Sequence, residues 1–234
     1  MSARPVVWPP SLERYGLSED QLARLATVLA ELERDEHAPT TVRGQSRAAN
    51  VHVADSLVAL DFDLLRGARE VADLGAGAGF PGVALAVALP QVQFRLIESQ
   101  RRKCEFIQRT IDAAGIGNAL VVCARAEQWN DGLSRNDAVL ARALAPQPVV
   151  LEYAAPLLRV GGALLDWRGR REPDQERAAS LAASELGLEL RELRHVEPFA
   201  GARERHVHVW QKTAETPARF PRRAGVARKR PLGG

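Results

Sequence analysis

The sequence predicts an α/β protein with a mainly parallel, seven-stranded sheet. After Gly67, short apolar strands alternate with amphipathic helices, which is typical of a parallel sheet covered by helices on both faces. The chain has 234 residues, of which 46% are hydrophobic and 26% charged, enough for a packed globular core. The first ~65 residues show only helical periodicity, so we expect a helical extension before the sheet.

Two helices are expected in the extension. Ser18 to Gln21 has the pattern of a capping box, and leucines recur at helical spacing up to about Glu33. A second helix is predicted over residues 46–60. We therefore divide the chain into a helical extension (residues 1–66), a sheet domain (67–212) and a basic flexible tail (213–234).

Seven strands and four helices are expected after the extension. The predicted strands are residues 70–74, 93–98, 119–123, 138–141, 162–166, 188–196 and 206–211. The predicted helices are residues 81–89, 101–114, 148–157 and 173–186. The last two strands are close in sequence, which predicts an antiparallel pair at one edge of the sheet.

Charge is distributed unevenly along the chain. Residues 212–234 contain seven basic residues and one acid, Glu215, so this end carries +6 and the rest of the chain −3. A basic end with several prolines and glycines predicts an arm that binds a polyanion such as RNA and is disordered until bound. A solvated end without a partner is the alternative.

Several other classes of protein are disfavoured. No apolar run approaches the ~20 residues that span a bilayer, and no signal-peptide pattern follows the first residues, so we expect a cytoplasmic protein without membrane contact. Cys104 and Cys123 form neither a Cys-x-x-Cys pair nor a cluster with histidine, which predicts no metal site. Their apolar neighbours predict two buried thiols.

A glycine-rich segment follows the first strand of the predicted sheet. Residues 73–82 read Asp-Leu-Gly-Ala-Gly-Ala-Gly-Phe-Pro-Gly. In a doubly wound sheet this turn lies beside the ligand crevice, and glycines let the backbone approach a ligand closely. The spacing Gly-x-Gly-x-Gly differs from the Gly-x-Gly-x-x-Gly of dinucleotide-binding folds, which argues against a nicotinamide-dependent oxidoreductase.

Two acidic residues accompany this loop. Glu98 ends the second strand of the sheet, where a carboxylate can accept both hydroxyl protons of a ribose. The alternative for Glu98 is an exposed acid at a strand end. Asp73 is expected to bind either the loop backbone or the ammonium group of a cofactor.

The loop resembles motif I of class I S-adenosylmethionine-dependent methyltransferases, and most closely that of the RsmG (GidB) family. Members of this family methylate N7 of a guanine in small-subunit (16S) ribosomal RNA. Further segments resemble the family in the same order: His-x-x-Asp-Ser-Leu at 52–57, a basic segment at 101–106, Ala-Arg-Ala at 141–143, Glu-Arg-His at 204–206 and the basic tail. The resemblance covers residues 22–232. It departs from the family at Pro39-Thr40-Thr41, where the family has Asn-Leu-Thr, and at Val51 and Arg168, on the expected RNA side.

The resemblance implies a Rossmann-like class I methyltransferase that uses S-adenosyl-L-methionine as its cofactor. Guanine N7 carries a lone pair and can accept the methyl group directly and in line, so orientation is the main requirement. No catalytic residue is assigned, although Arg142 is expected to position the substrate or the cofactor. The expected cofactor-binding residues are Asp73, Gly75, Gly77, Gly79, Phe80, Glu98, Ala126, Glu127 and Arg142. The expected RNA-binding residues are Arg43, Arg47, His52, Arg222, Arg223, Lys229 and Arg230.

The expected partner is 16S ribosomal RNA or the small ribosomal subunit, bound by a monomer without a metal. Two other classes stay open. A class I methyltransferase acting on a small molecule or a protein would not need the basic tail. The other open class is a non-enzymatic protein of the same fold or an oxidoreductase. Binding of S-adenosylhomocysteine without binding of NAD would exclude the oxidoreductase.

Overall fold

The computed structural model describes residues 6–234, so the first five residues of the predicted extension lie outside the described residues. The extension opens with a 3-10 helix, Pro10–Tyr15, followed by α1 (Glu19–Arg34). The capping box is present: the Gln21 N–H donates to Ser18 Oγ at 3.2 Å, and the Ser18 N–H donates to Gln21 Oε1 at 2.9 Å. The sequence prediction of where this helix begins is therefore confirmed.

The second helical segment of the extension changes its winding along its length. It runs through α2 (Gln45–Ala48), a π-helical stretch (Ala49–Ala54), α3 (Asp55–Leu57) and a 3-10 turn (Val58–Asp61). The predicted helix over residues 46–60 thus exists, but only part of it is α-helical. π-helical turns are frequent at functional sites, because the wider turn redirects the side chains that it carries.

A seven-stranded sheet forms the centre of the molecule, in the order β3-β2-β1-β4-β5-β7-β6. β7 is antiparallel to both of its neighbours, and the remaining pairs are parallel. The strands are β1 (Glu70–Leu74), β2 (Gln93–Glu98), β3 (Ala119–Cys123), β4 (Asn136–Arg142), β5 (Leu158–Arg168), β6 (Leu188–His195) and β7 (His206–Lys212). The predicted fold class and antiparallel edge are confirmed.

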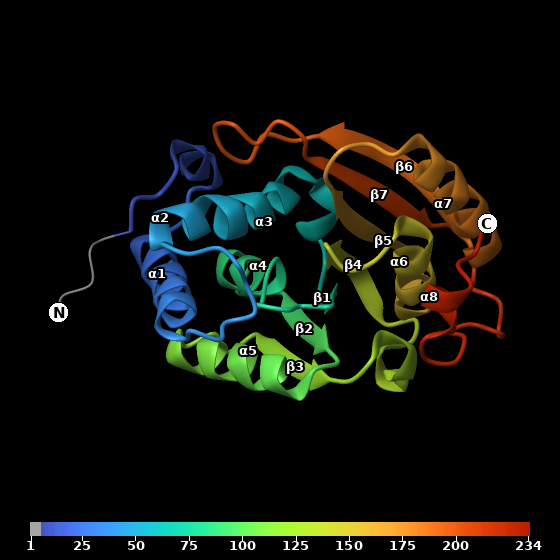
Figure 1. Cartoon of the computed structure of the whole chain (residues 1–234), viewed down its shortest axis with the longest axis horizontal. Helices are drawn as coiled ribbons and strands as arrows, with labels where there is room; N and C mark the ends of the chain where they lie inside the picture. The colour runs from blue at the N-terminus through green and yellow to red at the C-terminus, as the bar shows by residue number, and fades with distance from the viewer. Residues whose placement is uncertain (1–5) are drawn as a thin grey trace.

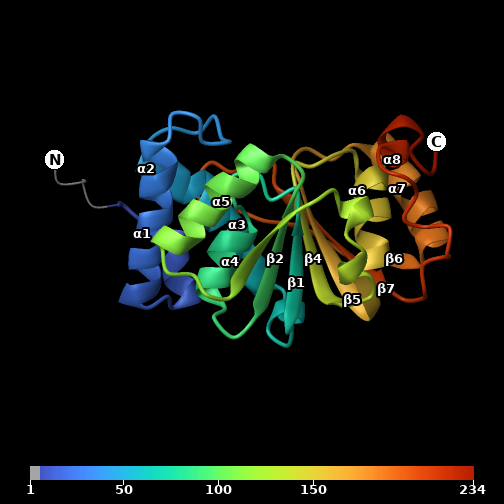
Figure 2. The ribbon, with the colours of Figure 1, turned by 90° about the horizontal axis from the view of Figure 1, so that it is seen from below.

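Helices cover both faces of this sheet (Figure 2). The extension, α4 (Gly82–Ala88) and α5 (Arg101–Ala113) lie on one side, and α6 (Gln147–Ala154), α7 (Pro173–Leu186) and α8 (Val226–Lys229) lie on the other. Alternate strand residues supply two separate cores: Val71 and Leu96 face the first group of helices, and Ala72 and Ile97 face the second.

The helical extension shares the first of these cores. Leu25, Leu29 and Leu57 are almost completely buried and belong to the same hydrophobic cluster as Val71 of β1. The extension lies beside α4 and α5 in Figure 1. Burial of apolar surface against the sheet domain therefore holds the extension in place.

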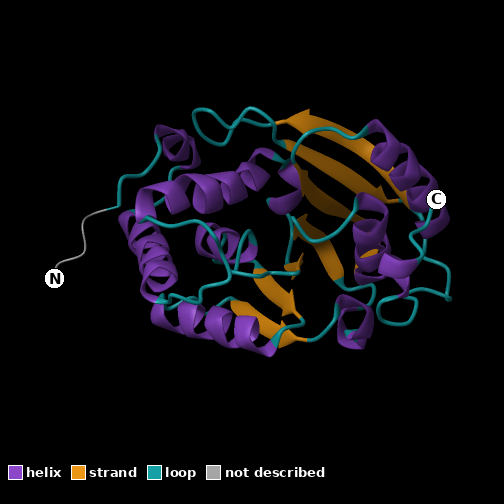
Figure 3. Cartoon of the chain, viewed as in Figure 1, coloured by secondary structure: helices purple, strands orange, loops and turns teal. Residues whose placement is uncertain are grey.

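The C-terminal segment, residues 213–234, differs from its prediction. Phe220 and Ala227 are buried in the second core, and Leu232 packs against it. Arg222 makes a two-pronged ion pair with the buried Glu152 of α6. The segment is mostly loop, yet it follows the outer surface of α6 and α7 (Figure 3). The expectation of a flexible tail, disordered until bound, is wrong, because apolar anchors and a partly buried ion pair hold it against the sheet domain.

Candidate functional site

The glycine-rich loop joins β1 to α4 through a sharp turn. Gly75, Gly77 and Gly79 have φ angles of 67°, 58° and 96°, a region that only glycine adopts readily. A Cβ added to Gly77 would meet only one protein atom within 4 Å, the carbonyl oxygen of Gly75 at 3.6 Å. The loop thus leaves open space beside its backbone, as close approach of a ligand requires.

Asp73, near the end of β1, binds the backbone of this loop. Its Oδ2 accepts a hydrogen bond from the Gly82 N–H at 2.8 Å, and burial raises its pKa to about 7. Asp73 is 1% exposed and does not line the neighbouring cavity. Of the two roles expected for Asp73, the geometry provides binding to the loop backbone.

Glu98 connects the loop to the end of β2. Its carboxylate accepts hydrogen bonds from the N–H groups of Gly77 (3.2 Å), Ser99 (2.7 Å) and Gln100 (2.9 Å). It also lines a cavity of about 510 Å³ at the carboxyl ends of β1, β2, β3 and β4. A carboxylate has about four lone-pair sites, so about one of them, on Oε2, is left for a ligand in the cavity.

The 510 Å³ cavity, hereafter the cofactor cavity, contains four of the predicted cofactor-binding residues: Gly75, Glu98, Ala126 and Glu127. Gly77 and Gly79 shape the loop at its edge. Further lining residues, which were not predicted to bind the cofactor, include Lys103, Ala143, Leu144, Tyr153 and Arg228. Arg142 and Phe80, also predicted, lie together beside a second cavity, with the guanidinium 6.0 Å from the ring centroid.

The second cavity, hereafter the basic cavity, has a volume of about 500 Å³. Its lining includes His52, Asp55, Arg142, Trp167, Arg168, Arg170 and Arg205. Ala143 lines both cavities and has a φ of 53°, which is unusual for a residue other than glycine. Backbone strain of this kind is often found at functional sites. The two cavities therefore adjoin at the end of β4.

A buried carboxylate organises the basic cavity. Asp55 Oδ2 accepts a hydrogen bond from Arg142 Nη1 at 2.7 Å, and Asp55 Oδ1 lies 3.5 Å from Arg205 Nε. The Trp167 indole N–H donates to the Asp55 carbonyl at 3.0 Å. One residue of the extension thus holds side chains from β4, β5 and the residue preceding β7.

His52, one helical turn before Asp55, is held in its neutral form. It stacks on Phe80 with ring centroids 4.8 Å apart. Arg142 Nη2 lies 3.5 Å from Nδ1, and Thr40 Oγ1 lies 2.9 Å from Nε2. Since a guanidinium only donates, Nδ1 is the acceptor and Nε2 carries the proton. Burial, assisted by the charge of Arg142, lowers the pKa of His52 to about 4.

This lowered pKa predicts a pH effect on stability. The unfolded state binds a proton on His52 near pH 6.5, and the folded state only near pH 4. The stabilising contribution of the neutral His52 to the free energy of unfolding is therefore fully present above pH 6.5 and is lost as the pH falls towards 4. A His52→Gln variant lacks this titration. We expect the difference in unfolding free energy between wild type and variant to shrink by about 2 kcal/mol from pH 7 to pH 4.5.

Urea denaturation of both proteins at the two pH values measures this difference. Other titrating groups, such as the buried His208, are present in both proteins and cancel. A difference that stays constant with pH would contradict the assignment.

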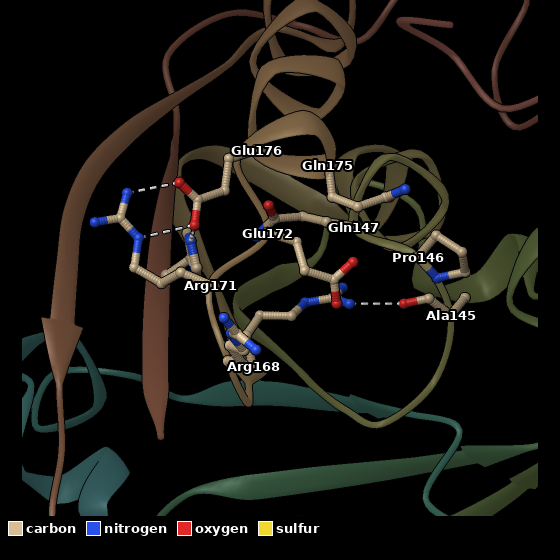
Figure 4. Close-up of a pocket in the computed structure, with 10 residues that line it drawn as sticks. Ala145, Pro146, Gln147, Arg168, Arg171, Glu172, Gln175 and Glu176 are labelled. Carbon is tan, nitrogen blue, oxygen red and sulfur yellow. Dashed lines mark hydrogen bonds and ion pairs between the residues drawn. The ribbon is translucent and has the colours of Figure 1, made fainter. Parts of the chain in front are cut away.

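A third cavity of about 310 Å³ lies next to the basic cavity (Figure 4). The two share Arg168, Arg170 and Glu172. Arg168 donates to the Ala145 carbonyl at 2.8 Å, and Arg171 forms a double hydrogen bond with Glu176. Arg168 and Arg171 thus donate to protein acceptors, although Arg168 Nη2 is buried without a hydrogen-bond partner.

The predicted RNA-binding residues fall into two groups. Arg43, Arg47, Arg223, Lys229 and Arg230 are exposed, and His52 lines the basic cavity. Arg222 differs: its guanidinium is engaged by Glu152 and by the Arg230 carbonyl. Arg222 thus uses its Nε and Nη2 donors within the protein, and its role as an RNA contact stays a prediction.

Within residues 6–234, no three histidine, cysteine, aspartate or glutamate side chains gather in a way that would bind a metal ion. Over the same residues, no helix combines the length and apolar character needed to cross a bilayer. Cys104 is buried as predicted, with its thiol 3.2 Å from the Glu98 carbonyl, whereas Cys123 is exposed on the edge strand β3. The prediction of two buried thiols is thus half wrong.

Some site residues had a signal in the sequence and others did not. Asp55 and Arg205 occur in the segments that resemble the RsmG family, although no role was assigned to them. Tyr153 and Arg228 had no local signal, because they reach the cofactor cavity only when α6 and the C-terminal segment are packed together.

Comparison with known proteins identifies relatives of the chain over most of its length. Residues 18–207 match the model of the GidB family, described as rRNA small subunit methyltransferase G. The ribosomal RNA small subunit methyltransferase G of Syntrophomonas wolfei is 41% identical over 77% of this chain and 85% of its own length. The protein of that name from Thermotoga neapolitana is 33% identical over 94% of this chain and 96% of its own. A solved S-adenosylmethionine-dependent methyltransferase from Aquifex aeolicus shares the fold, with a TM-score of 0.55 and 14% identity over 71% of this chain and 93% of that one.

Proposed function

The chain belongs to the GidB family of rRNA small subunit methyltransferases, and on that premise we propose which ligand each of its two cavities binds. The protein is an S-adenosylmethionine-dependent methyltransferase that acts on N7 of a guanine in ribosomal RNA. The cofactor cavity binds S-adenosylmethionine, and the basic cavity receives the target guanosine of 16S ribosomal RNA.

The observation that carries this proposal is the position of Ala143. This residue lines both cavities, so a ligand in one lies next to a ligand in the other. Holding two reactants side by side in a fixed orientation is the main contribution that a protein makes to a direct transfer. An isolated cofactor cavity without this neighbour would not support methylation of a large substrate.

The residues of the cofactor cavity fit the cofactor. Glu98 keeps an acceptor site for a ribose hydroxyl, and the loop at Gly77 leaves backbone space open. Ala126 and Glu127, at the carboxyl end of β3, would hold the adenine region. When bound, S-adenosylmethionine supplies an electrophilic methyl group.

The basic cavity orients the guanine and needs no base. Guanine N7 already carries its lone pair, and His52 is held neutral by burial and by Arg142. Arginine often donates to both O6 and N7 of guanine. A donor on N7 would block the reacting lone pair, so we assign Arg142 and Arg205 to O6 or to a phosphate oxygen.

The exposed basic residues are assigned to the RNA backbone. Arg43 and Arg47 lie in the extension, and Arg223, Lys229 and Arg230 lie in the C-terminal segment. Contacts of this kind fix the position of an RNA without reading its sequence. Residues of one chain line both cavities, which supports action as a monomer, and a ribosomal RNA substrate supports a cytoplasmic location.

The experiment that tests the function incubates the purified protein with radiolabelled S-adenosylmethionine and small ribosomal subunits or naked 16S RNA that lack the modification. RNA and protein fractions are then separated, and N7-methylguanosine is mapped by chemical cleavage. We expect label in the RNA at one guanine. Label in the protein fraction, or no N7-methylguanosine, would contradict the proposal.

Replacing Glu98 with alanine is expected to weaken the binding of S-adenosylhomocysteine by about 1–3 kcal/mol, because charge-assisted hydrogen bonds to the ribose are lost. Glu98→Gln separates two contributions, since glutamine keeps an acceptor but loses the charge. We expect its affinity to lie between those of wild type and Glu98→Ala. Isothermal titration calorimetry measures all three; equal affinities would reject the ribose role.

A further inference from the structure

The C-terminal segment, residues 213–234, is fastened next to the cofactor cavity. Directly before it, the buried Lys212 at the end of β7 donates to the Leu186 carbonyl at the end of α7, at 2.9 Å. In its middle, Phe220 is 7% exposed, and Arg222 Nε donates to Glu152 Oε1 of α6 at 2.6 Å. Near its end, α8 lies against α6 (Figure 1). These anchors place the segment at a defined position beside the cavity.

From this position the segment reaches two walls of the cofactor cavity. The Gly225 N–H donates to Glu127 Oε1 at 3.0 Å, at the carboxyl end of β3. Arg228 Nη2 donates to the Leu144 carbonyl at 3.1 Å, just after β4. Glu127, Leu144 and Arg228 all line the cavity. The segment therefore bridges the ends of two strands that lie on opposite sides of β1 and β2 in the sheet order.

We propose that the C-terminal segment is part of the cofactor site, with Arg228 as a binding residue for the adenosyl portion of S-adenosylmethionine and Gly225 as a positioning residue for Glu127. The inference rests on the proposed function of the cofactor cavity. It adds that the C-terminal segment, which lies outside the sheet, forms one wall of that cavity. A guanidinium is planar and permanently charged, and it can stack on an aromatic ring or donate to its nitrogens.

This role differs from that of an RNA-binding arm. Arg222 and Arg228 direct their donors towards protein acceptors at α6 and at the cofactor cavity. A segment that served only to attract phosphate would not need Phe220 in the core or a backbone hydrogen bond to Glu127. The exposed Arg223, Lys229 and Arg230 keep the expected RNA role, and the same segment therefore serves both ligands.

Calorimetric titration with S-adenosylhomocysteine tests the inference, with the full-length protein and two arginine variants. Arg228→Ala removes the side chain from the cavity wall. Arg219→Ala is the matched control, since Arg219 lies in the same segment but pairs with the exposed Glu185 and does not line the cavity. We expect Arg228→Ala to raise the dissociation constant about 3- to 10-fold, as loss of one or two hydrogen bonds or stacking contacts implies. Arg219→Ala should leave it unchanged.

A truncated protein that ends at residue 216 extends the test. It loses both the Gly225 and the Arg228 contacts, and we expect a larger loss of affinity than in Arg228→Ala. Thermal denaturation of every variant shows whether it is folded. If the truncated protein does not fold, the affinity of the Arg228→Ala variant alone decides whether the inference holds.

The possible outcomes separate failure of the Arg228 proposal from failure of the proposed function of the cofactor cavity. Absence of S-adenosylhomocysteine binding by the wild type would reject the proposed function itself. Binding by the wild type and equal binding by a folded Arg228→Ala would overturn only the inference. A loss that is as large in Arg219→Ala would also overturn it, because the effect would then follow from the segment's charge and not from the cavity wall.

Discussion

Substitution of Gly77 by valine is expected to abolish binding of S-adenosylhomocysteine while the protein stays folded. The new side chain would enter space that the protein leaves open, since only the Gly75 carbonyl lies within 4 Å of the added Cβ. We expect affinity to fall at least about 100-fold, or about 2.7 kcal/mol. The positive φ of 58° makes valine strained, which should lower the free energy of unfolding by about 1–3 kcal/mol.

Gly16 provides a matched control for this strain. Its φ of 59° is nearly the same, and nothing lies within 4 Å of an added Cβ, but it ends a 3-10 helix in the extension. Gly16→Val should therefore lower stability by a similar amount and leave affinity unchanged. Calorimetry and urea denaturation of both variants separate the two effects. Undiminished affinity in Gly77→Val would count against the assignment of the loop.

Removing the Asp55 carboxylate is expected to have the largest effect on stability. Asp55→Ala leaves Arg142, whose side chain is 15% exposed, without the partner that it now contacts at 2.7 Å. Breaking a buried ion pair from one side costs about 3–5 kcal/mol, because the remaining charge is left without compensation. Methylation of ribosomal RNA should fall as well, since Arg142 and Arg205 lose the group that holds them in the basic cavity.

The control is Asp63→Ala, which removes an exposed carboxylate whose partner, Arg66, is also exposed. Exposed pairs contribute little, so no measurable change in unfolding by urea is expected. A double-mutant cycle with Arg142→Ala isolates the pair: if the two residues act together, the double variant should be more stable than the sum of the single losses predicts. Equal effects of Asp55→Ala and Asp63→Ala would contradict the structural role.

The sheet was largely predictable because its strands repeat a local pattern. β1, β2 and β3 begin and end at the predicted residues. β5 is longer than predicted, at Leu158–Arg168, because Arg159, Val160 and Gly161 are all exposed and show no alternation of apolar and polar residues. Leu158 pairs with Asn136 and Ala163 with Ala138, so the strand continues across an irregular stretch that the side-chain pattern does not mark.

The candidate site was predictable where it depends on one short segment. The glycine loop and Glu98 were identified from spacing along a strand, a turn and the next strand, and all of them meet at the cofactor cavity or at its edge. Arg142 was identified as well, but its partner Asp55 was not, since the two are 87 residues apart. Only packing of the extension against the sheet domain brings them together.

By itself, the sequence determined the fold class, the glycine-rich turn at which we propose that the cofactor binds, and the family to which the chain belongs, because these depend on residue types within a few positions of one another. The tertiary structure alone decided the place of the C-terminal segment. Its composition predicted a flexible arm, whereas Phe220, Ala227 and the ion pair of Arg222 with Glu152 hold it against α6 and α7. An isolated apolar residue carries no periodic signal, and its burial depends on a surface that exists only after the helices have packed on the sheet.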